Sequence, residues 1–164
     1  MKIIIAPDSF KECLSAERVA QALERGLRRK IPHADYRRLP LADGGEGTTA
    51  ALVAATDGRI RRQRVMGPLG RPAQGLIGVT GDGCTAILEM ASASGLPLVP
   101  TEHRDPRLTT TYGTGELIRY AVQMKVRKII IGIGGSATND GGAGMAQALG
   151  VRFYDSRMKL ISPP

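Results

Sequence analysis

Residues 129–150, IIIGIGGSATNDGGAGMAQALG, constrain the fold of this chain more than any other segment. A run of β-branched apolar residues leads into a glycine-rich loop, and an apolar run with helical character follows. A buried strand, a glycine loop and a helix in this order are typical of α/β folds and place backbone N–H groups where phosphate binds well. The segment therefore predicts a phosphate-binding loop, with the amides around Gly134, Gly135 and Ser136 as anion contacts and Asn139 as a further binding candidate.

The same loop contains an acid, Asp140. A carboxylate repels a bare phosphate but can hold a divalent cation that bridges to phosphate oxygens, so we expect a metal-bound polyphosphate here. The pattern Gly132-x-Gly134-x-x-Ala137 also matches the dinucleotide fingerprint, but the poor helix formers of residues 139–142 stand where its helix must begin. A plain strand–helix turn with Asp140 as an N-cap stays open as the alternative.

A second loop follows the short apolar strand predicted at residues 3–6, which breaks at Pro7. Asp8, Ser9 and Lys11 lie in this loop, before a helix that Ser15 is expected to cap. In an open α/β sheet, ligands bind at the carboxyl ends of the strands. Lys11 is a mobile point charge suited to a phosphate or a carboxylate, although a solvated surface lysine is the simpler interpretation.

A third loop repeats the Asp-Gly-Gly pattern of residues 140–142. Asp43, Gly44, Gly45 and Glu46 stand between an extended segment and a helix that opens at Thr48. Each of the three loops alone could be an ordinary turn. Together, at one edge of a sheet, they predict a shared site whose candidate substrate- and phosphate-binding residues are Asp8, Ser9, Gly44, Gly45, Glu46, Gly134, Gly135, Ser136 and Asn139.

These motifs carry a family resemblance. KIIIAPDSFKECLSA, PLADGGEGT, ILEMASASGL, RDPRLTTTYGTGELI and IIIGIGGSATNDGGAGMAQALG, in this order, resemble the N-terminal half of the bacterial glycerate kinases that form 2-phosphoglycerate. The resemblance implies a two-domain α/β kinase that uses ATP and Mg²⁺ to phosphorylate a hydroxyl of glycerate. In that scheme Asp140 and Asp43 are candidates for metal binding or for accepting the hydroxyl proton, and Lys11 neutralises phosphate charge or grips the glycerate carboxylate.

The resemblance extends to about Tyr154, and the chain stops soon afterwards. Family members continue with a second half of comparable size, so we expect a truncated chain that lacks the C-terminal half and is inactive alone. The alternative is a non-catalytic fragment that binds a nucleotide or another anion. Which acid is the base and which binds metal is left open, as is the formation of a homo-oligomer.

Composition argues against two other classes of protein. The net charge of +8 suggests a nucleic-acid partner, but only 4% of residues are aromatic and no stacking residues interleave with the basic ones. No apolar run approaches the ~20 residues of a membrane span, and Lys2 precedes too few apolar residues for a signal peptide. We therefore expect a cytoplasmic protein that acts on small molecules, with no nucleic-acid or membrane partner.

Strand and helix patterns alternate along most of the chain. They predict a Rossmann-like parallel core formed by residues 1–58 and 106–164, and a partly antiparallel excursion at residues 59–105 that contains a β-hairpin. Helices are expected at residues 16–31, 48–55 and 114–125. Glu89 ends a predicted strand and is expected to pair with an arginine, or to face a cleft.

Overall fold

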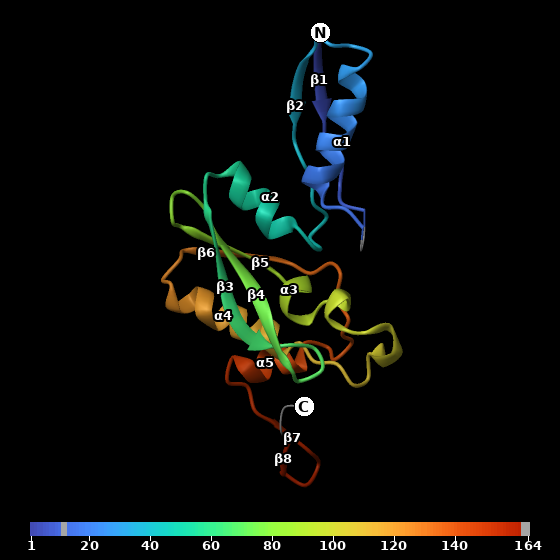
Figure 1. Cartoon of the computed structure of the whole chain (residues 1–164). Helices are drawn as coiled ribbons and strands as arrows, with labels where there is room; N and C mark the ends of the chain where they lie inside the picture. The colour runs from blue at the N-terminus through green and yellow to red at the C-terminus, as the bar shows by residue number, and fades with distance from the viewer. Residues whose placement is uncertain (11–12, 162–164) are drawn as a thin grey trace.

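The computed structural model describes residues 1–10 and 13–161 and shows a mixed α/β fold (Figure 1). Its N-terminal unit is β1 (Lys2–Ile5), α1 (Ala16–Arg28) and β2 (Asp35–Arg38). The two strands pair in parallel, with Lys2 opposite Asp35, and α1 forms the crossover between them. Ser15 caps α1 as predicted, because its hydroxyl accepts the Arg18 N–H at 3.4 Å.

A second sheet holds the centre of the molecule, in the order β3-β4-β5-β6. Its strands are β3 (Arg59–Met66), β4 (Pro72–Val79), β5 (Thr85–Glu89) and β6 (Lys128–Gly132). β3, β4 and β5 are antiparallel neighbours, whereas β6 runs parallel to β5. The predicted antiparallel hairpin is therefore confirmed as β4–β5, and the expected combination of parallel and antiparallel strands is present.

Helices cover this sheet and connect its strands. α2 (Thr48–Ala55) packs against β3, β4 and β5, and α4 (Tyr112–Gln123) packs against β3, β4 and β5 and contacts α5 (Ala143–Ala148). Between β5 and α4 lie the short helix α3 (Ala91–Ser94) and two 3₁₀ turns, η1 (Leu96–Leu98) and η2 (Thr101–His103). A small hairpin of β7 (Phe153–Tyr154) and β8 (Leu160–Ile161) follows α5 (Figure 1).

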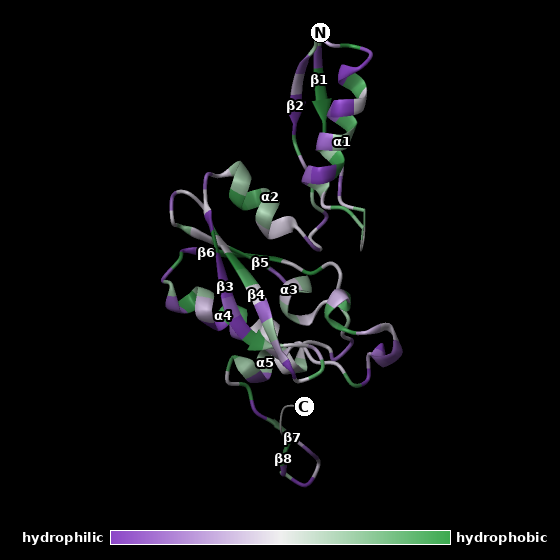
Figure 2. Cartoon of the chain, in the orientation of Figure 1, coloured by the Kyte–Doolittle hydropathy of each residue, from purple (hydrophilic) through white to green (hydrophobic). Residues whose placement is uncertain are grey.

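The hydrophobic core lies between α4 and the sheet. Leu117 and Ala121 of α4 are fully buried against Val65, Ile77 and Leu88 from three neighbouring strands. Figure 2 shows β5 as largely hydrophobic and β3 as largely hydrophilic. β3 carries its arginines at the edge of the sheet, where charged side chains discourage pairing with another chain.

The sheet topology cuts across the predicted division of the chain. β3, β4 and β5 belong to the segment 59–105, yet they share one sheet with β6 from the segment 106–164. β1 and β2, from the segment 1–58, pair only with each other among the described strands. The division into 1–58 with 106–164, and 59–105, therefore stays a prediction about domains that this sheet does not follow.

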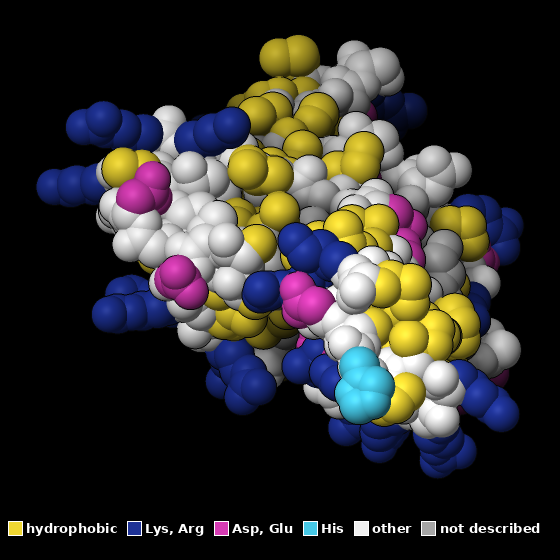
Figure 3. Space-filling model, turned by 90° about the horizontal axis from the view of Figure 1, so that it is seen from above, with side chains coloured by type: hydrophobic (Ala, Val, Ile, Leu, Met, Phe, Trp, Pro, Cys, Tyr) yellow, Lys and Arg dark blue, Asp and Glu magenta, His cyan; other side chains and the backbone are white. Residues whose placement is uncertain are grey.

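Apolar side chains also reach the surface at the N-terminal unit. Ile4, Phe10, Leu39 and Leu41 are each more than half exposed, at 60%, 60%, 54% and 55%. Seen from above in Figure 3, hydrophobic side chains gather over the middle of the face and Lys and Arg side chains stand around its rim. In the described part of the chain, no helix has the length and apolar character needed to cross a membrane.

Candidate active site

The two Asp-Gly-Gly motifs share the same hydrogen bond, from the N–H of the second glycine to the aspartate side chain. Asp43 Oδ1 accepts the Gly45 N–H at 2.8 Å, and Asp140 Oδ1 accepts the Gly142 N–H at 3.0 Å. Aspartate favours such turns because its short side chain reaches the backbone two residues ahead. The recurrence in the sequence therefore has a structural cause, and any difference in function depends on what surrounds each acid.

Glycines 132 and 134 bring the end of β6 against the loop of residues 43–47. The Gly134 N–H donates to the Gly44 oxygen at 2.9 Å. A Cβ atom at Gly132 would lie 2.4 Å from the Gly44 oxygen, and one at Gly134 would lie 2.8 Å from the Gly45 nitrogen. Only glycine permits this contact, through which two loops far apart in the sequence pack directly against each other.

The loop after β6 is held on its other side by the segment after β5. The Leu96 N–H donates to the Gly135 oxygen and the Ala137 N–H donates to the Ser94 oxygen, both at 2.9 Å. These bonds leave the N–H groups of Gly135 and Ser136 without a protein partner among the described residues. The two amides are therefore available to an anion, as the sequence predicts for the amides of this loop.

A cavity of about 350 Å³ lies where these segments meet. Its lining brings together many of the residues predicted for the site: Ser9, Asp43, Gly45, Glu46, Gly135 and Ser136. Ala91, Leu96, Pro97 and Arg104 complete the lining. Residues from all three predicted loops thus face one hollow, although Asp8, Asn139 and Asp140 are not part of its lining.

Asp43 and Glu46 give this cavity two carboxylates. Asp43 makes a single hydrogen bond in the described part of the chain, through Oδ1 to the Gly45 N–H, so Oδ2 remains available. Glu46 lines both this cavity and a larger neighbouring one. No group of three or more His, Cys, Asp or Glu residues that could hold a metal occurs among the described residues. A metal at this site would thus depend on two carboxylates and on oxygens of its ligand.

Asp140 has a different environment, because it ties the start of α4 to the start of α5. Its Oδ2 accepts the Thr111 N–H at 2.9 Å, the Thr111 hydroxyl at 2.8 Å and the Gly144 N–H at 3.2 Å. Partial burial raises the pKa of Asp140, but hydrogen bonds from Thr111, Gly142 and Gly144 outweigh it and bring that pKa below its ordinary value. The carboxylate is thus stabilised as an anion by the fold itself.

The remaining predicted residues lie around this arrangement. Asp8 Oδ1 accepts the Ser9 N–H at 2.6 Å, which fixes the turn after β1. Asn139 is exposed, and Lys11 lies outside the described residues. Gly44 and Gly134 form the loop contact described above rather than the cavity lining.

Glu89 is a buried acid whose partner differs from the sequence-based expectation. It is 3% exposed, and its Oε2 accepts the Thr49 N–H at 2.9 Å, so no arginine pairs with it in the described part of the chain. The carboxylate satisfies a free N–H at the start of α2, a position where negative charge is favourable. Its place at the end of a buried strand was the only sequence signal, and the helix that it meets is 40 positions away.

Arg104 lines the cavity and is the residue that sequence reasoning did not single out. It follows η2, and its Nε donates to the Val99 oxygen at 3.2 Å. This segment has no periodic pattern, so nothing in the sequence places Arg104 beside Asp43 and Glu46, with which it lines the cavity.

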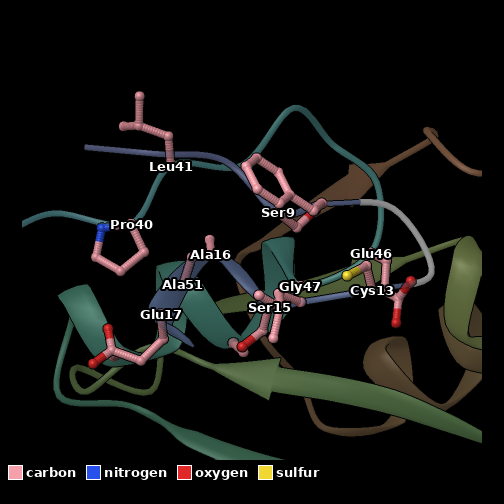
Figure 4. A pocket seen from close by; sticks show the side chains of 14 residues that line it. Ser9, Cys13, Ser15, Ala16, Glu17, Pro40, Leu41, Glu46, Gly47 and Ala51 are labelled. Atoms are coloured by element: carbon pink, nitrogen blue, oxygen red, sulfur yellow. The ribbon is translucent and has the colours of Figure 1, made fainter. Parts of the chain in front are cut away.

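A larger cavity of about 640 Å³ adjoins the first. Figure 4 shows it between the start of α1, the segment after β2 that carries Pro40 and Leu41, and α2 with Ala51. Ser9 and Glu46 line both cavities, so the two hollows meet at these side chains. Most other lining residues are apolar, which makes this second hollow a poor place for a phosphate.

Comparison with known proteins gives a consistent result. The model of the glycerate kinase family matches residues 3–164. The chain is 61% identical over 163 residues to a glycerate kinase of Bacillus subtilis (strain 168), covering 99% of this chain and 43% of that relative. It is 60% identical over 156 residues to a glycerate 2-kinase of Escherichia coli (strain K12), covering 95% and 41%.

A solved structure agrees with these sequence matches. The crystal structure of a Salmonella typhimurium LT2 protein that carries the name glycerate kinase 2 superposes with a TM-score of 0.79 at 59% identity. The match covers 99% of this chain and 43% of that one. The chain thus spans less than half the length of the relatives that it resembles.

Proposed function

We propose that this chain, which belongs to the glycerate kinase family, provides part of a site that transfers a phosphoryl group from Mg-ATP to a hydroxyl of glycerate. The observation that carries the proposal is the cavity of about 350 Å³ that Asp43, Glu46, Ser9 and the Gly135–Ser136 amides share. Carboxylates, a hydroxyl and unpaired N–H groups in one hollow are what a phosphoryl-transfer site needs for positioning and for balancing charge.

Asp43 is the proposed acceptor of the hydroxyl proton. Its Oδ1 is fixed by the Gly45 N–H, which leaves Oδ2 to face the substrate hydroxyl. As the hydroxyl oxygen forms its bond to the γ-phosphorus, its proton passes to Asp43, and the bond from the γ-phosphorus to the β–γ bridging oxygen breaks. ADP then carries away that electron pair. A base positioned in this way contributes ~10²–10⁴-fold to the rate.

The N–H groups of Gly135 and Ser136 are proposed to contact phosphate oxygens. Both are held in place by the backbone bonds of their loop to residues 94–96, so they need no rearrangement when the anion arrives. Ser9 offers its hydroxyl from the turn after β1. Lys11 follows two positions later in the sequence and remains our candidate for neutralising phosphate charge.

The donor set fits a magnesium ion. Mg²⁺ is usually held by one or two carboxylates together with substrate phosphates and water, and Asp43 and Glu46 line the same cavity. Glu46 would hold the ion together with phosphate oxygens and water, and the ion would neutralise charge on the polyphosphate, while Asp43 Oδ2 stays available for the hydroxyl proton. Asp140, which the sequence proposes as a metal ligand or base, is assigned here to positioning, because its carboxylate already accepts four hydrogen bonds.

The second candidate function is a non-catalytic anion- or nucleotide-binding fragment, favoured by the chain's coverage of only 43% of the Bacillus subtilis relative. Two proteins separate the candidates: the chain alone, and a chimera in which it replaces the matching part of that relative. Both are assayed for ADP release with glycerate, ATP and Mg²⁺. Glycerate-dependent turnover by the chimera, lost on Asp43→Asn, supports the kinase assignment. A folded chimera without turnover contradicts it.

A further inference from the structure

We propose that Glu89 is a positioning residue, which holds the start of α2 from the end of β5 and thereby fixes Glu46 in the cavity beside Asp43. The inference rests on the proposed phosphoryl transfer and adds a residue that contacts neither substrate. Glu89 lines neither cavity, so it acts only through the loop of residues 43–47 and the helix that follows.

The first argument is that the Glu46 side chain has no polar contact of its own to hold it. Its carboxylate makes no hydrogen bond or ion pair within the described part of the chain, although it lines both cavities. The backbone therefore decides where this carboxylate lies. That backbone leads directly into α2, which begins at Thr48, two positions after Glu46 (Figure 4).

The second argument is that the backbone is anchored on both sides of Glu46. Before it, the Gly134 N–H donates to the Gly44 oxygen at 2.9 Å. After it, the Thr49 N–H donates to Glu89 Oε2 at 2.9 Å. The two anchors come from neighbouring strand ends, because β5 and β6 are paired in parallel. Loss of the Glu89 anchor would leave the loop fixed from one side.

The third argument is that α2 lacks a side-chain cap from its own segment. Its N-cap is Gly47, which has a φ of 91° and no side chain to accept an N–H. The hydroxyls of Thr48 and Thr49 are buried and have no hydrogen-bond partner among the described residues. Glu89 supplies the missing acceptor from 40 positions away, and its negative charge suits a helix N-terminus.

Glu116 provides a matched control. Its Oε2 accepts the Met66 N–H at 2.6 Å, so this glutamate also ties a helix to a strand through a backbone N–H. It belongs to α4 and lines neither cavity. Its replacement removes the same kind of support without removing an anchor of the loop of residues 43–47.

The test uses the chimera with the Bacillus subtilis relative and the variants Glu89→Ala, Glu89→Gln, Glu89→Asp and Glu116→Ala. For Glu89→Ala we expect the Mg²⁺ concentration that gives half-maximal turnover to rise about tenfold, the lower end of the effect of losing a supporting hydrogen bond at a metal site. Glu116→Ala should keep the parental Mg²⁺ requirement.

The two conservative variants separate the hydrogen bond from the charge. Glu89→Gln should stay close to the parent, because its amide oxygen can still accept the Thr49 N–H. Glu89→Asp keeps the charge but has a shorter side chain, so it should shift the Mg²⁺ requirement in the same direction as Glu89→Ala.

Hydrogen exchange supplies a readout that needs neither metal nor turnover. In the chimera, the peptide that covers residues 43–49 should exchange faster in Glu89→Ala than in the parent, because the start of α2 opens locally. The same peptide should exchange at the parental rate in Glu89→Gln and in Glu116→Ala. Mass spectrometry of the exchanged protein measures both effects.

The outcomes distinguish the two proposals. If the folded parent chimera does not phosphorylate glycerate, the proposed function fails and this inference fails with it. If the parent is active and Glu89→Ala shows the same Mg²⁺ requirement as Glu116→Ala, Glu89 does not position the site, although the kinase assignment stands. A Glu89→Gln variant as impaired as Glu89→Ala would show that the charge acts directly, which also overturns the inference. Should Glu89→Ala melt below the assay temperature, Glu89→Asp decides, and a parental Mg²⁺ requirement overturns the inference.

Discussion

The same substitution should affect different properties at the two acids: Asp140→Asn should lower stability, whereas Asp43→Asn should lower turnover. Asp140→Asn removes a charge that accepts four hydrogen bonds at 2.8–3.2 Å, and its amide would turn an NH₂ group towards either the Gly142 N–H or the donors from Thr111 and Gly144. Hydrogen bonds to a charged group contribute about 1.5–3 kcal/mol each, against about 0.5–1.5 kcal/mol for neutral pairs. Allowing for partial exposure, we expect a loss of about 2–4 kcal/mol in the free energy of unfolding.

Asp43→Asn should leave stability nearly unchanged. Asp43 makes one hydrogen bond among the described residues, to the Gly45 N–H, and asparagine forms the same turn. We expect a change below about 1 kcal/mol, with turnover of the chimera reduced ~10²–10⁴-fold. Urea denaturation of each variant gives the free energies of unfolding, and the ADP-release assay below the melting temperature gives the turnover.

The pH dependence of Asp140→Asn supplies an independent check. The pKa of Asp140 is lowered in the folded protein, so its stabilising contribution is present above the ordinary aspartate pKa of about 3.9 and is lost as pH falls through the folded value. The stability gap between the parent and Asp140→Asn should therefore be full at pH 7 and should shrink below about pH 4. A variant with parental stability and abolished turnover would refute this reasoning and would return Asp140 to the chemistry.

Three further results are expected. Gly132→Ala should destabilise the chimera by more than about 2 kcal/mol, because its Cβ would lie 2.4 Å from the Gly44 oxygen. Gly26→Ala in α1, where nothing lies within 4 Å of the added Cβ, should instead stabilise it by about 0.5–1 kcal/mol. Urea denaturation measures both changes, and equal effects would contradict the close contact between the loops. Glu89→Ala should lower the free energy of unfolding by about 1–3 kcal/mol, because it leaves the Thr49 N–H buried without an acceptor, and Glu89→Gln should lower it less. Thermal unfolding of the parent and both variants tests this, and identical melting temperatures would show that Glu89 does not cap α2. The chain alone should show no sustained glycerate-dependent ADP release, because a phosphoryl-transfer site must enclose both substrates and the chain covers 43% of the Bacillus subtilis relative. Turnover by the chain alone that disappears on Asp43→Asn would contradict this expectation.

Local patterns predicted most of the individual elements. The helix at residues 48–55 has the bounds of α2, the predicted hairpin is β4–β5, and Ser15 caps α1. The sequence patterns predicted no separate strand at β3, because arginines at residues 59, 61, 62 and 64 interrupt its apolar positions. The strand forms nevertheless, because at the edge of the sheet those side chains can remain in solvent while Val65 reaches the core.

The sequence by itself determined the loops, their turns and their glycines, because these depend on residues only a few positions apart. It also supplied the family resemblance, which the family match over residues 3–164 confirms. Only the tertiary structure decided what each acid faces. Two Asp-Gly-Gly motifs with the same internal hydrogen bond have different surroundings: the carboxylate of Asp43 lines a cavity, while that of Asp140 joins two helices.

The same holds for Glu89, whose hydrogen-bond partner lies 40 positions away, and for Arg104, which lines a cavity together with residues distant in the sequence. The role of a side chain depends on the charges and hydrogen-bond donors around it. These groups belong to segments that meet only when the sheet and its helices pack. Residue type and spacing set which chemistry is available to the chain. The packing of β5, β6 and α2 decides where that chemistry is exposed to a ligand.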